Sequence, residues 1–430
     1  MSTIKDHPLR YEIANELHAR PFPALDVPSH AAFLAIKQPE NAASRDREAD
    51  FAHLLRLLDR FGAPHPQPGA THYFGEIGRH RLKWESHSEF VTYTIFADGV
   101  NERPFDPAAF GLFPEDWLAE MPGRRITSAL IRIEPRPDDD TIRARIREWF
   151  VTESVAAVEV LDGAAVLAGD FRIDPAGHLR FATFIGPDVT PRRVGRIVQR
   201  ICEIEIYKTM AMLGLIEARA IAGQLRQVGD ALSELVEGLS GSACEAEEDL
   251  AELLALSSEL EGLTARTSYR FGASRAYEAI VHDRIKVLRE ARFGNRQTLT
   301  DFMMRRFDPA MRTVRASEKR LERMAIRAAR AGNLLRTRVD VERSAQNQEL
   351  LASMDRRADL QLRLQETVEG LSVVAISYYA VSLASYLAYP LTEVTGLSKG
   401  EITALLVIPV VLVVWMMVRQ IRTHIAKKLP

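Results

Sequence analysis

The hydrophobic pattern changes its period once along the chain, close to residue 186. Upstream, short apolar runs with a period of two are separated by turn residues, a pattern typical of strands in a sheet. Asp162-Gly163 and the segment from Asp174 to Gly177 predict two of the turns. Helices are predicted over Arg45 to Phe61 and Asp139 to Phe150, so residues 1–186 are expected to form an α+β (or α/β) domain. The predicted strands are Phe33 to Ile36, His72 to Glu76, Arg81 to Glu85, Phe90 to Phe96, Leu130 to Glu134, Val155 to Leu161, Val166 to Phe171 and Leu179 to Phe184.

Helical periodicity takes over after Gly186-Pro187. Thr190 and Pro191 suit an N-cap and a first helical turn, and Gly238 to Ser242 predicts the end of this helix. A second helix is expected to return from about Cys244 towards Phe302, with an interruption near Phe271-Gly272 or Phe293-Gly294. Residues 187–308 are therefore predicted to form a helical hairpin.

Residues 309–370 are predicted to be a stalk helix. No proline occurs between Pro309 and Pro390, so the stalk and the segment after it can form one helix of about 80 residues. Its apolar seam has the three- and four-residue steps of a coiled coil, and we favour self-association through this seam over packing on the chain's own domain. The seam consists of Val314, Leu321, Met324, Ala328, Ala331, Leu335 and Val339, and it resumes at Leu350, Met354, Leu360, Leu364 and Val368.

Two uncharged apolar segments near the C-terminus predict a transmembrane hairpin. Residues 371–391 and residues 402–418 are each long enough to cross a bilayer core, and Pro409 is expected to kink the second. Residues 392–401 then form a short outer loop that contains Glu393 and Glu401. A buried core hairpin is the alternative, but two such segments so close together are uncommon in soluble folds.

The distribution of lysine and arginine predicts the orientation. Arg356, Arg357 and Arg363 precede the first span, and residues 419–430 form a basic tail after the second, whereas the loop between them has only Lys399. Because positive charge stays inside, both termini are expected in the cytoplasm of a bacterium, with the hairpin in its inner membrane. The N-terminus also lacks the pattern of a secretory signal.

The formal net charge is only −2, and we expect no nucleic-acid binding. That average hides two blocks of opposite charge. Residues 230–261 hold ten acidic and no basic residues, whereas residues 284–338 hold sixteen basic and five acidic ones. Acidic and basic blocks usually form solvated or paired faces, but the acidic tip of the helical hairpin could also gather cations. This tip consists of Glu245, Glu247, Glu248, Asp249 and Glu252.

Common catalytic, nucleotide-binding and metal-binding signatures are absent, so we expect no enzyme, no metal site and no bound cofactor. The two cysteines, Cys202 and Cys244, form neither a disulfide framework nor a zinc motif. Glu16, His18 and Arg20 place an acid, an imidazole and a guanidinium close together. They form a possible ligand-binding segment, although a structural role at the end of a helix is the more favoured interpretation.

The first span has one face of small or hydroxylated side chains. Such a face can line a polar pore or let helices approach closely, and without an ionisable group in either span we slightly favour helix packing. The face consists of Ser372, Ala375, Tyr379, Ser382, Tyr386 and Tyr389.

Three stretches resemble a bacterial family catalogued only as a domain of unknown function. They are residues 7–10 (HPLR), residues 15–22 (NELHARPF) and residues 361–379 (QLRLQETVEGLSVVAISYY). This resemblance covers the whole chain and implies membrane association.

The order of segments is also similar to that of CorA-type magnesium channels, which have a cytosolic domain, an acidic hairpin, a long stalk and two spans. That similarity implies a homopentamer with a pore along the first span. Where CorA-type channels carry Gly-Met-Asn, this chain reads Tyr389-Pro390-Leu391.

These patterns together predict an oligomeric inner-membrane protein whose cytosolic, sensor-like domain is coupled to the spans. Its self-association is expected through the stalk and the first span. Cation passage is the most concrete version, with a divalent cation such as magnesium as the transported or regulatory ion. The alternative is a membrane-anchored scaffold or adaptor with no transport activity, whose cytosolic domain has a protein partner.

Overall fold

The computed structural model describes residues 6–11, 22–40, 44–238, 246–388, 390 and 398–426. The chain divides into two compact units. The first comprises Met1–Gly238 and Ala251–Ala331, and the second comprises Leu239–Leu250 and Gly332–Pro430.

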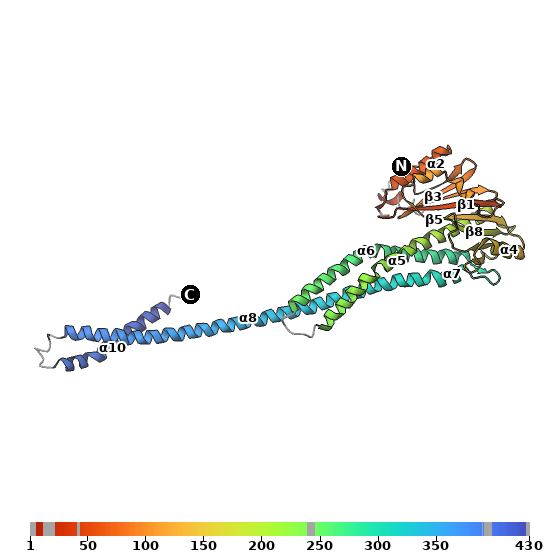
Figure 1. Ribbon diagram of the computed structural model, residues 1–430. Coiled ribbons are helices and arrows are strands. Elements are labelled where there is room, and N and C mark those ends of the chain that lie inside the picture. Colours follow the sequence, from red (N-terminus) through yellow and green to blue (C-terminus); the bar gives the residue numbers. More distant parts are fainter. Residues whose placement is uncertain are drawn as a thin grey trace. The chain divides into compact units, whose positions relative to one another are not determined.

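Within the described residues, nine strands of the first unit form one sheet (Figure 1). Their spatial order is β2-β3-β4-β1-β5-β8-β7-β6-β9, and only β5 and β8 among these strands pair in parallel. This mostly antiparallel sheet fits an α+β fold better than α/β. The strands are β1 (Ser29–Lys37), β2 (His72–Ile77), β3 (His80–Ser86), β4 (Phe90–Asp98), β5 (Arg124–Pro135), β6 (Ala156–Val160), β7 (Ala165–Gly169), β8 (Leu179–Ile185) and β9 (Ala291–Arg292).

One face of the sheet carries the main hydrophobic core. The core joins alternate strand residues, such as Leu82 and Trp84 of β3, to apolar side chains of the covering helices, such as Leu54 and Ile142. Successive strand residues point to opposite faces, so the residues between them face the other layer. The covering helices are α2 (Arg47–Arg60), the 3-10 helix η2 (Pro107–Leu112), α3 (Glu115–Ala119) and α4 (Asp139–Trp149).

Long helices lie on the opposite face (Figure 1). α5 (Pro191–Gly238) begins at the predicted Thr190-Pro191 signal, and Thr190 O accepts from two backbone amides of its first turn. α6 (Ala246–Leu288) passes through Phe271-Gly272 without a break, so the interruption predicted there is wrong, whereas the alternative near Phe293-Gly294 is confirmed. β9 lies in that interruption and was not predicted, and α7 (Leu299–Arg306) follows it as a separate short helix.

α8 (Asp308–Leu387) is one continuous helix of 80 residues, as predicted. Between Val314 and Ala331 its apolar seam is buried inside the first unit, with every seam side chain at most 8% exposed. Of the two interpretations that the sequence left open, packing on the chain's own domain therefore holds for this part of the seam. The later seam residues from Leu350 to Val368 are about 57–65% exposed.

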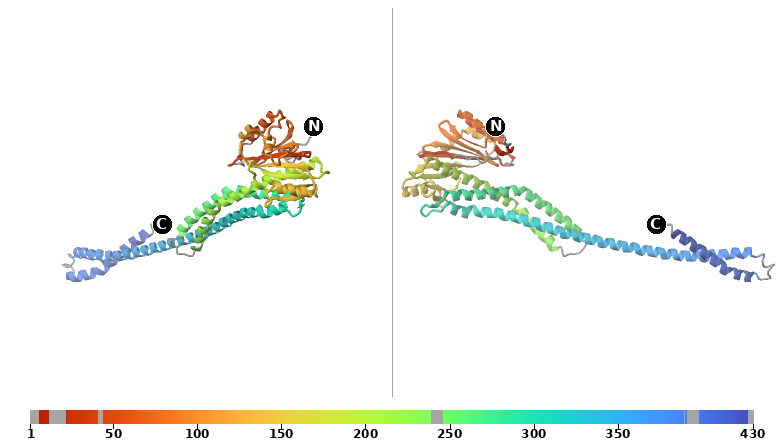
Figure 2. Two further views of the ribbon diagram at one scale, coloured as in Figure 1. Left: turned by 45° about the vertical axis from the view of Figure 1, so that its right-hand side comes forward. Right: turned by 180° about the vertical axis from the view of Figure 1, so that it is seen from behind.

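The second unit contains the two segments predicted to span a membrane. α10 (Lys399–Ala426) runs back beside the end of α8 (Figure 2), and Ser377 and Val414 are the most deeply buried described side chains of the two spans. Both helices are long and apolar enough to cross a membrane, and only 6% of each apolar window is buried. A helix from the core of a soluble protein would be mostly buried, so these segments are not core helices of this chain.

Candidate functional site

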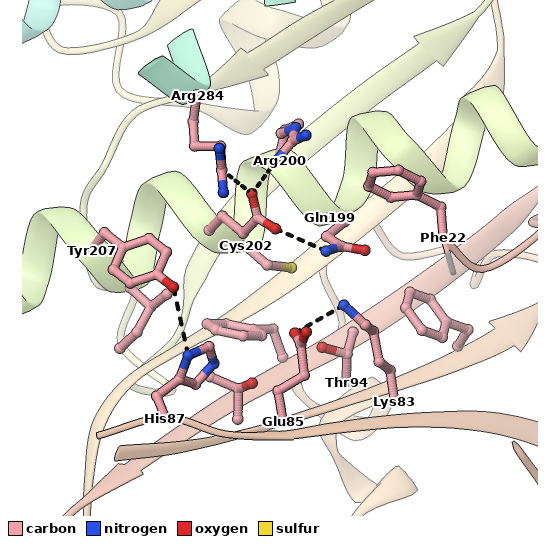
Figure 3. Close-up of a pocket in the computed structure, with 15 residues that line it drawn as sticks. Phe22, Lys83, Glu85, His87, Thr94, Gln199, Arg200, Cys202, Tyr207 and Arg284 are labelled. Atoms are coloured by element: carbon pink, nitrogen blue, oxygen red, sulfur yellow. Dashed lines mark hydrogen bonds and ion pairs between the residues drawn. The ribbon is translucent and has the colours of Figure 1, made fainter. Parts of the chain in front are cut away.

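A cavity of about 340 Å³ lies in the first unit between the sheet and α5 (Figure 3). It is on the face opposite the main hydrophobic core. The size falls in the range of small-molecule sites. Ten of its fifteen lining side chains are charged or polar, without counting Cys202. The cavity is therefore mainly polar.

The sheet wall comes from alternate positions of neighbouring strands. Leu82 and Trp84 of β3 point into the hydrophobic core, which places Lys83 and Glu85 on the cavity side. Lys83 Nζ and Glu85 Oε2 are 2.8 Å apart, and both side chains are largely buried. Thr94 of β4 pairs in register with Lys83 and adds a hydroxyl to the same wall.

The helix wall is built around the carboxylate of Glu203 on α5. Gln199 Nε2 donates to Glu203 Oε1 over 2.8 Å, and Arg200 Nη1 donates to Glu203 Oε2 over 2.5 Å. Arg284 of α6 brings its Nε within 2.5 Å of the same Oε2 (Figure 3). Both oxygens of Glu203 are therefore engaged, and one carboxylate is shared between two guanidinium groups.

Phe22 lines the cavity from the segment that precedes β1. Arg196 and Arg200 lie 5.1 Å and 5.5 Å from the centre of its ring, within reach of a cation–π interaction. The segment is seated closely on α5, because a Cβ at Gly195 would lie only 1.7 Å from Pro23 O. Glycine at position 195 thus allows the close approach that places Phe22.

The other end of the cavity is aromatic. Tyr207 of α5 lies 3.5 Å from His87 Nδ1 through its hydroxyl, and its ring stacks on Tyr277 of α6 at 5.6 Å between centres. Beyond it, Glu89 is fully buried and pairs with Arg270 at 2.9 Å. Burial and the Glu89 charge raise the pKa of Tyr277 well above its ordinary value, so this phenol stays neutral.

Cys202 is the thiol in the cavity wall. Burial raises its pKa far above the ordinary value, although the nearby Lys83 ammonium acts in the opposite direction. Because the thiolate is the nucleophile, Cys202 is inert at neutral pH. The arrangement of paired charges, hydroxyls and aromatic rings is suited to holding a polar molecule.

The sequence did not predict this cavity. The visible signal was two charged residues, Lys83 and Glu85, inside a strand whose alternate positions are apolar. Their partners on α5 lie more than a hundred positions later, and nothing in the spacing of Gln199, Arg200 and Glu203 shows which strand that helix covers.

The hydroxylated face of the first span points away from the buried contact at Ser377. Ser372, Ala375, Tyr379 and Tyr386 are exposed, and Ser382 is half-buried. The hydroxyl of Ser372 donates to Val368 O of its own helix, so it is already satisfied within the helix. Tyr389 of this predicted face lies outside the described residues.

The predicted acidic residues of the outer loop and the hairpin tip have local roles. Glu401 accepts from the backbone amide and the hydroxyl of Ser398 at the start of α10. Glu247, Glu248 and Asp249 lie in the first turn of α6, where acidic groups stabilise a helix, and Glu252 follows one turn later. Glu247 also pairs with Arg343 at 2.8 Å.

Several predicted residues lie outside the part of the chain that the structure describes. They are Glu16, His18, Arg20, Glu245 and Glu393. In the part that it does describe, no group of three or more His, Cys, Asp or Glu residues is arranged to hold a metal ion.

Comparisons with known proteins add a family and no activity. No curated protein matches the chain, and no solved structure matches it. The similarity of layout to CorA-type magnesium channels therefore gains no support from a known structure. A family model described as "Protein of unknown function (DUF3422)" matches residues 5–425, so the chain belongs to this family.

Proposed function

We propose that the protein is a membrane-anchored binding protein whose sensor-like cytosolic body holds a small molecule. In this proposal the protein has no transport activity of its own. The observation that carries this proposal is the polar cavity beside Glu203, in a chain that also has two helices of membrane-spanning length and apolarity. Burying paired charges costs desolvation free energy. A role in binding a ligand gives a reason for them in a chamber of this size.

The inner membrane of a bacterium is the proposed location, with both termini in the cytoplasm. Arg356, Arg357 and Arg363 before the first span and Arg419 and Arg422 at the end of the second support this orientation. The apolar residues of α8 from Leu350 to Val368 are exposed, and they support self-association of copies held in the same bilayer. A protein partner of the cytosolic body is the scaffold version of the same proposal.

The test of binding uses the full-length protein purified in detergent. A panel of small metabolites is screened for compounds that raise its melting temperature, because a ligand that binds only the folded state stabilises it. At least one compound should do so, and the effect should disappear in Thr94→Phe, which fills the cavity. Thr313→Phe, at an exposed position of α8, is the matched control. A panel in which no compound raises the melting temperature contradicts the proposal.

A second candidate function, cation passage by an oligomer, has one observation in its favour. The exposed face with Ser372, Tyr379 and Tyr386 is free to meet the same face of other copies around an axis. Reconstitution into liposomes under a magnesium gradient tests it directly. No flux above that of empty liposomes would remove this candidate.

A further inference from the structure

Four polar atoms of the cavity-lining residues are buried without a hydrogen-bond partner, and two of these, Lys83 Nζ and Arg284 Nε, lie in ion pairs with Glu85 and Glu203. The other two have neither a hydrogen bond nor an ion pair. They are Gln199 Oε1, an acceptor, and Arg200 Nε, a charged donor. The other ends of both side chains are engaged by Glu203. Burying a polar atom without a partner costs free energy, and the cost is larger when the atom is charged. A ligand that satisfies both atoms recovers that free energy.

The charges of the wall show which sign of ligand fits. Lys83, Arg200 and Arg284 contribute three positive charges, whereas Glu85 and Glu203 contribute two negative ones. Glu85 pairs with Lys83, and Glu203 is shared by both arginines, so neither carboxylate is free to attract a cation. One positive charge remains uncompensated in a partly enclosed site, where electrostatic attraction is stronger than in bulk water.

We propose that the cavity binds a small anion, a carboxylate or a phosphate monoester, that also carries a hydroxyl or amino group. The anionic group accepts hydrogen bonds from Arg200 and Arg284, and the hydroxyl or amino group donates to Gln199 Oε1. Phe22, Phe33 and Phe96 cover the carbon atoms of the ligand. This inference rests on the proposed binding function and adds the chemical class of the ligand.

The experiment titrates the full-length protein in detergent with matched probes, by isothermal calorimetry. Malate carries carboxylates and a hydroxyl, succinate lacks the hydroxyl, glycerol 3-phosphate replaces carboxylate by phosphate, and glycerol lacks the anion. Spermidine is the cationic probe. Malate or glycerol 3-phosphate should bind saturably, and the comparison of these two distinguishes carboxylate from phosphate. Succinate and glycerol should each bind about tenfold more weakly than their matched hydroxylated anion.

Variants test the assigned contacts. Arg200→Gln and, independently, Arg284→Gln should weaken binding of the anion about tenfold, because each removes a charged donor. Gln199→Met should abolish the preference for malate over succinate. Arg192→Gln is the matched control, because Arg192 is exposed on the same helix and does not line the cavity, and the binding by this variant should equal that of the unchanged protein. Each variant is first shown to melt cooperatively.

The outcomes separate the two proposals. If glycerol or spermidine binds with a dependence on Arg200 or Gln199 while the anions do not, the ligand class is overturned and the binding function stands. Anion binding that neither Arg200→Gln nor Arg284→Gln weakens also overturns the assignment to this cavity. If no probe binds and the wider metabolite panel is also silent, the binding function itself fails.

Discussion

At the scale of single residues, His53 shows how a polar side chain is accommodated between the sheet and its covering helices. His53 of α2 is completely buried, with Nδ1 3.1 Å from the Tyr93 hydroxyl and Nε2 3.0 Å from Trp117 O. Its ring stacks on Trp117 at 4.0 Å between centres. The opposite face of the sheet carries the polar cavity beside Glu203.

Burial lowers the pKa of His53 to about 4, so the ring stays neutral in the folded protein down to about pH 4. The unfolded chain takes up this proton near pH 6.5, as a free histidine does. Between those values the unfolded state binds more protons, so the free energy of unfolding falls as the pH drops from about 6.5 to about 4, by roughly 3 kcal/mol from this residue. Denaturant unfolding at several pH values should show a shallower slope for His53→Gln. A slope for His53→Gln equal to that of the unchanged protein would contradict this assignment.

Glycine at position 195 is expected to be essential for seating the segment that carries Phe22. Gly195→Ala places a Cβ against Pro23 O, so the segment must shift, and the melting temperature should fall by the equivalent of about 1–3 kcal/mol. Gly223→Ala is the matched control on the same helix, where the Cβ meets nothing within 4 Å. This control should be neutral or stabilised by about 0.5–1 kcal/mol. Equal melting temperatures for Gly195→Ala and the unchanged protein would contradict the close seating.

At the scale of elements, the sequence was sufficient to predict those helices and strands that have a clear hydrophobic period and are bounded by turn or capping residues. The turn at Asp162-Gly163 joins β6 to β7 as predicted, with both residues at positive φ. Thr190-Pro191 likewise predicted the start of α5, and the absence of proline predicted the continuous helix α8. β9 is only two residues long, and α7 is short and begins with a Thr298–Asp301 capping box inside a region that had been assigned to a longer helix.

The cavity could not be predicted in this way, because it is made by the contact between two layers. Lys83 and Arg200 each have an ordinary local setting, one in a strand and one in a helix. Only the tertiary packing of α5 on the sheet brings them to the same chamber. The apolar seam of α8 shows the same limit, because its spacing fits both self-association and packing within the chain.

The two parts of that seam are predicted to behave differently. Leu321→Ala removes a side chain that is 4% exposed, so it should destabilise the body by about 2–5 kcal/mol without being needed for self-association. Leu364→Ala changes a side chain that is 65% exposed, so it should leave the melting temperature unchanged and weaken self-association. Thermal melting and light scattering in detergent separate the two effects. An oligomer that Leu364→Ala leaves intact would count against association through this part of α8.

At the scale of the whole molecule, the account requires one chain to combine two environments. The body buries charged pairs such as Glu89 with Arg270 and keeps its cavity polar, whereas the ends of α8 and α10 expose apolar side chains such as Leu383, Leu405 and Ile408. A soluble protein does not expose apolar surface on this scale without a partner. The two helices are long and apolar enough to cross a lipid bilayer.

The most direct test of membrane anchoring is extraction of membranes that carry the full-length protein with alkaline carbonate, beside a form that ends at Gly370. This treatment removes peripheral proteins and leaves spanning ones. The full-length protein should stay in the membrane pellet and enter solution only with detergent, whereas the shortened form should appear in the soluble fraction. Recovery of the full-length protein in the carbonate supernatant would contradict the account.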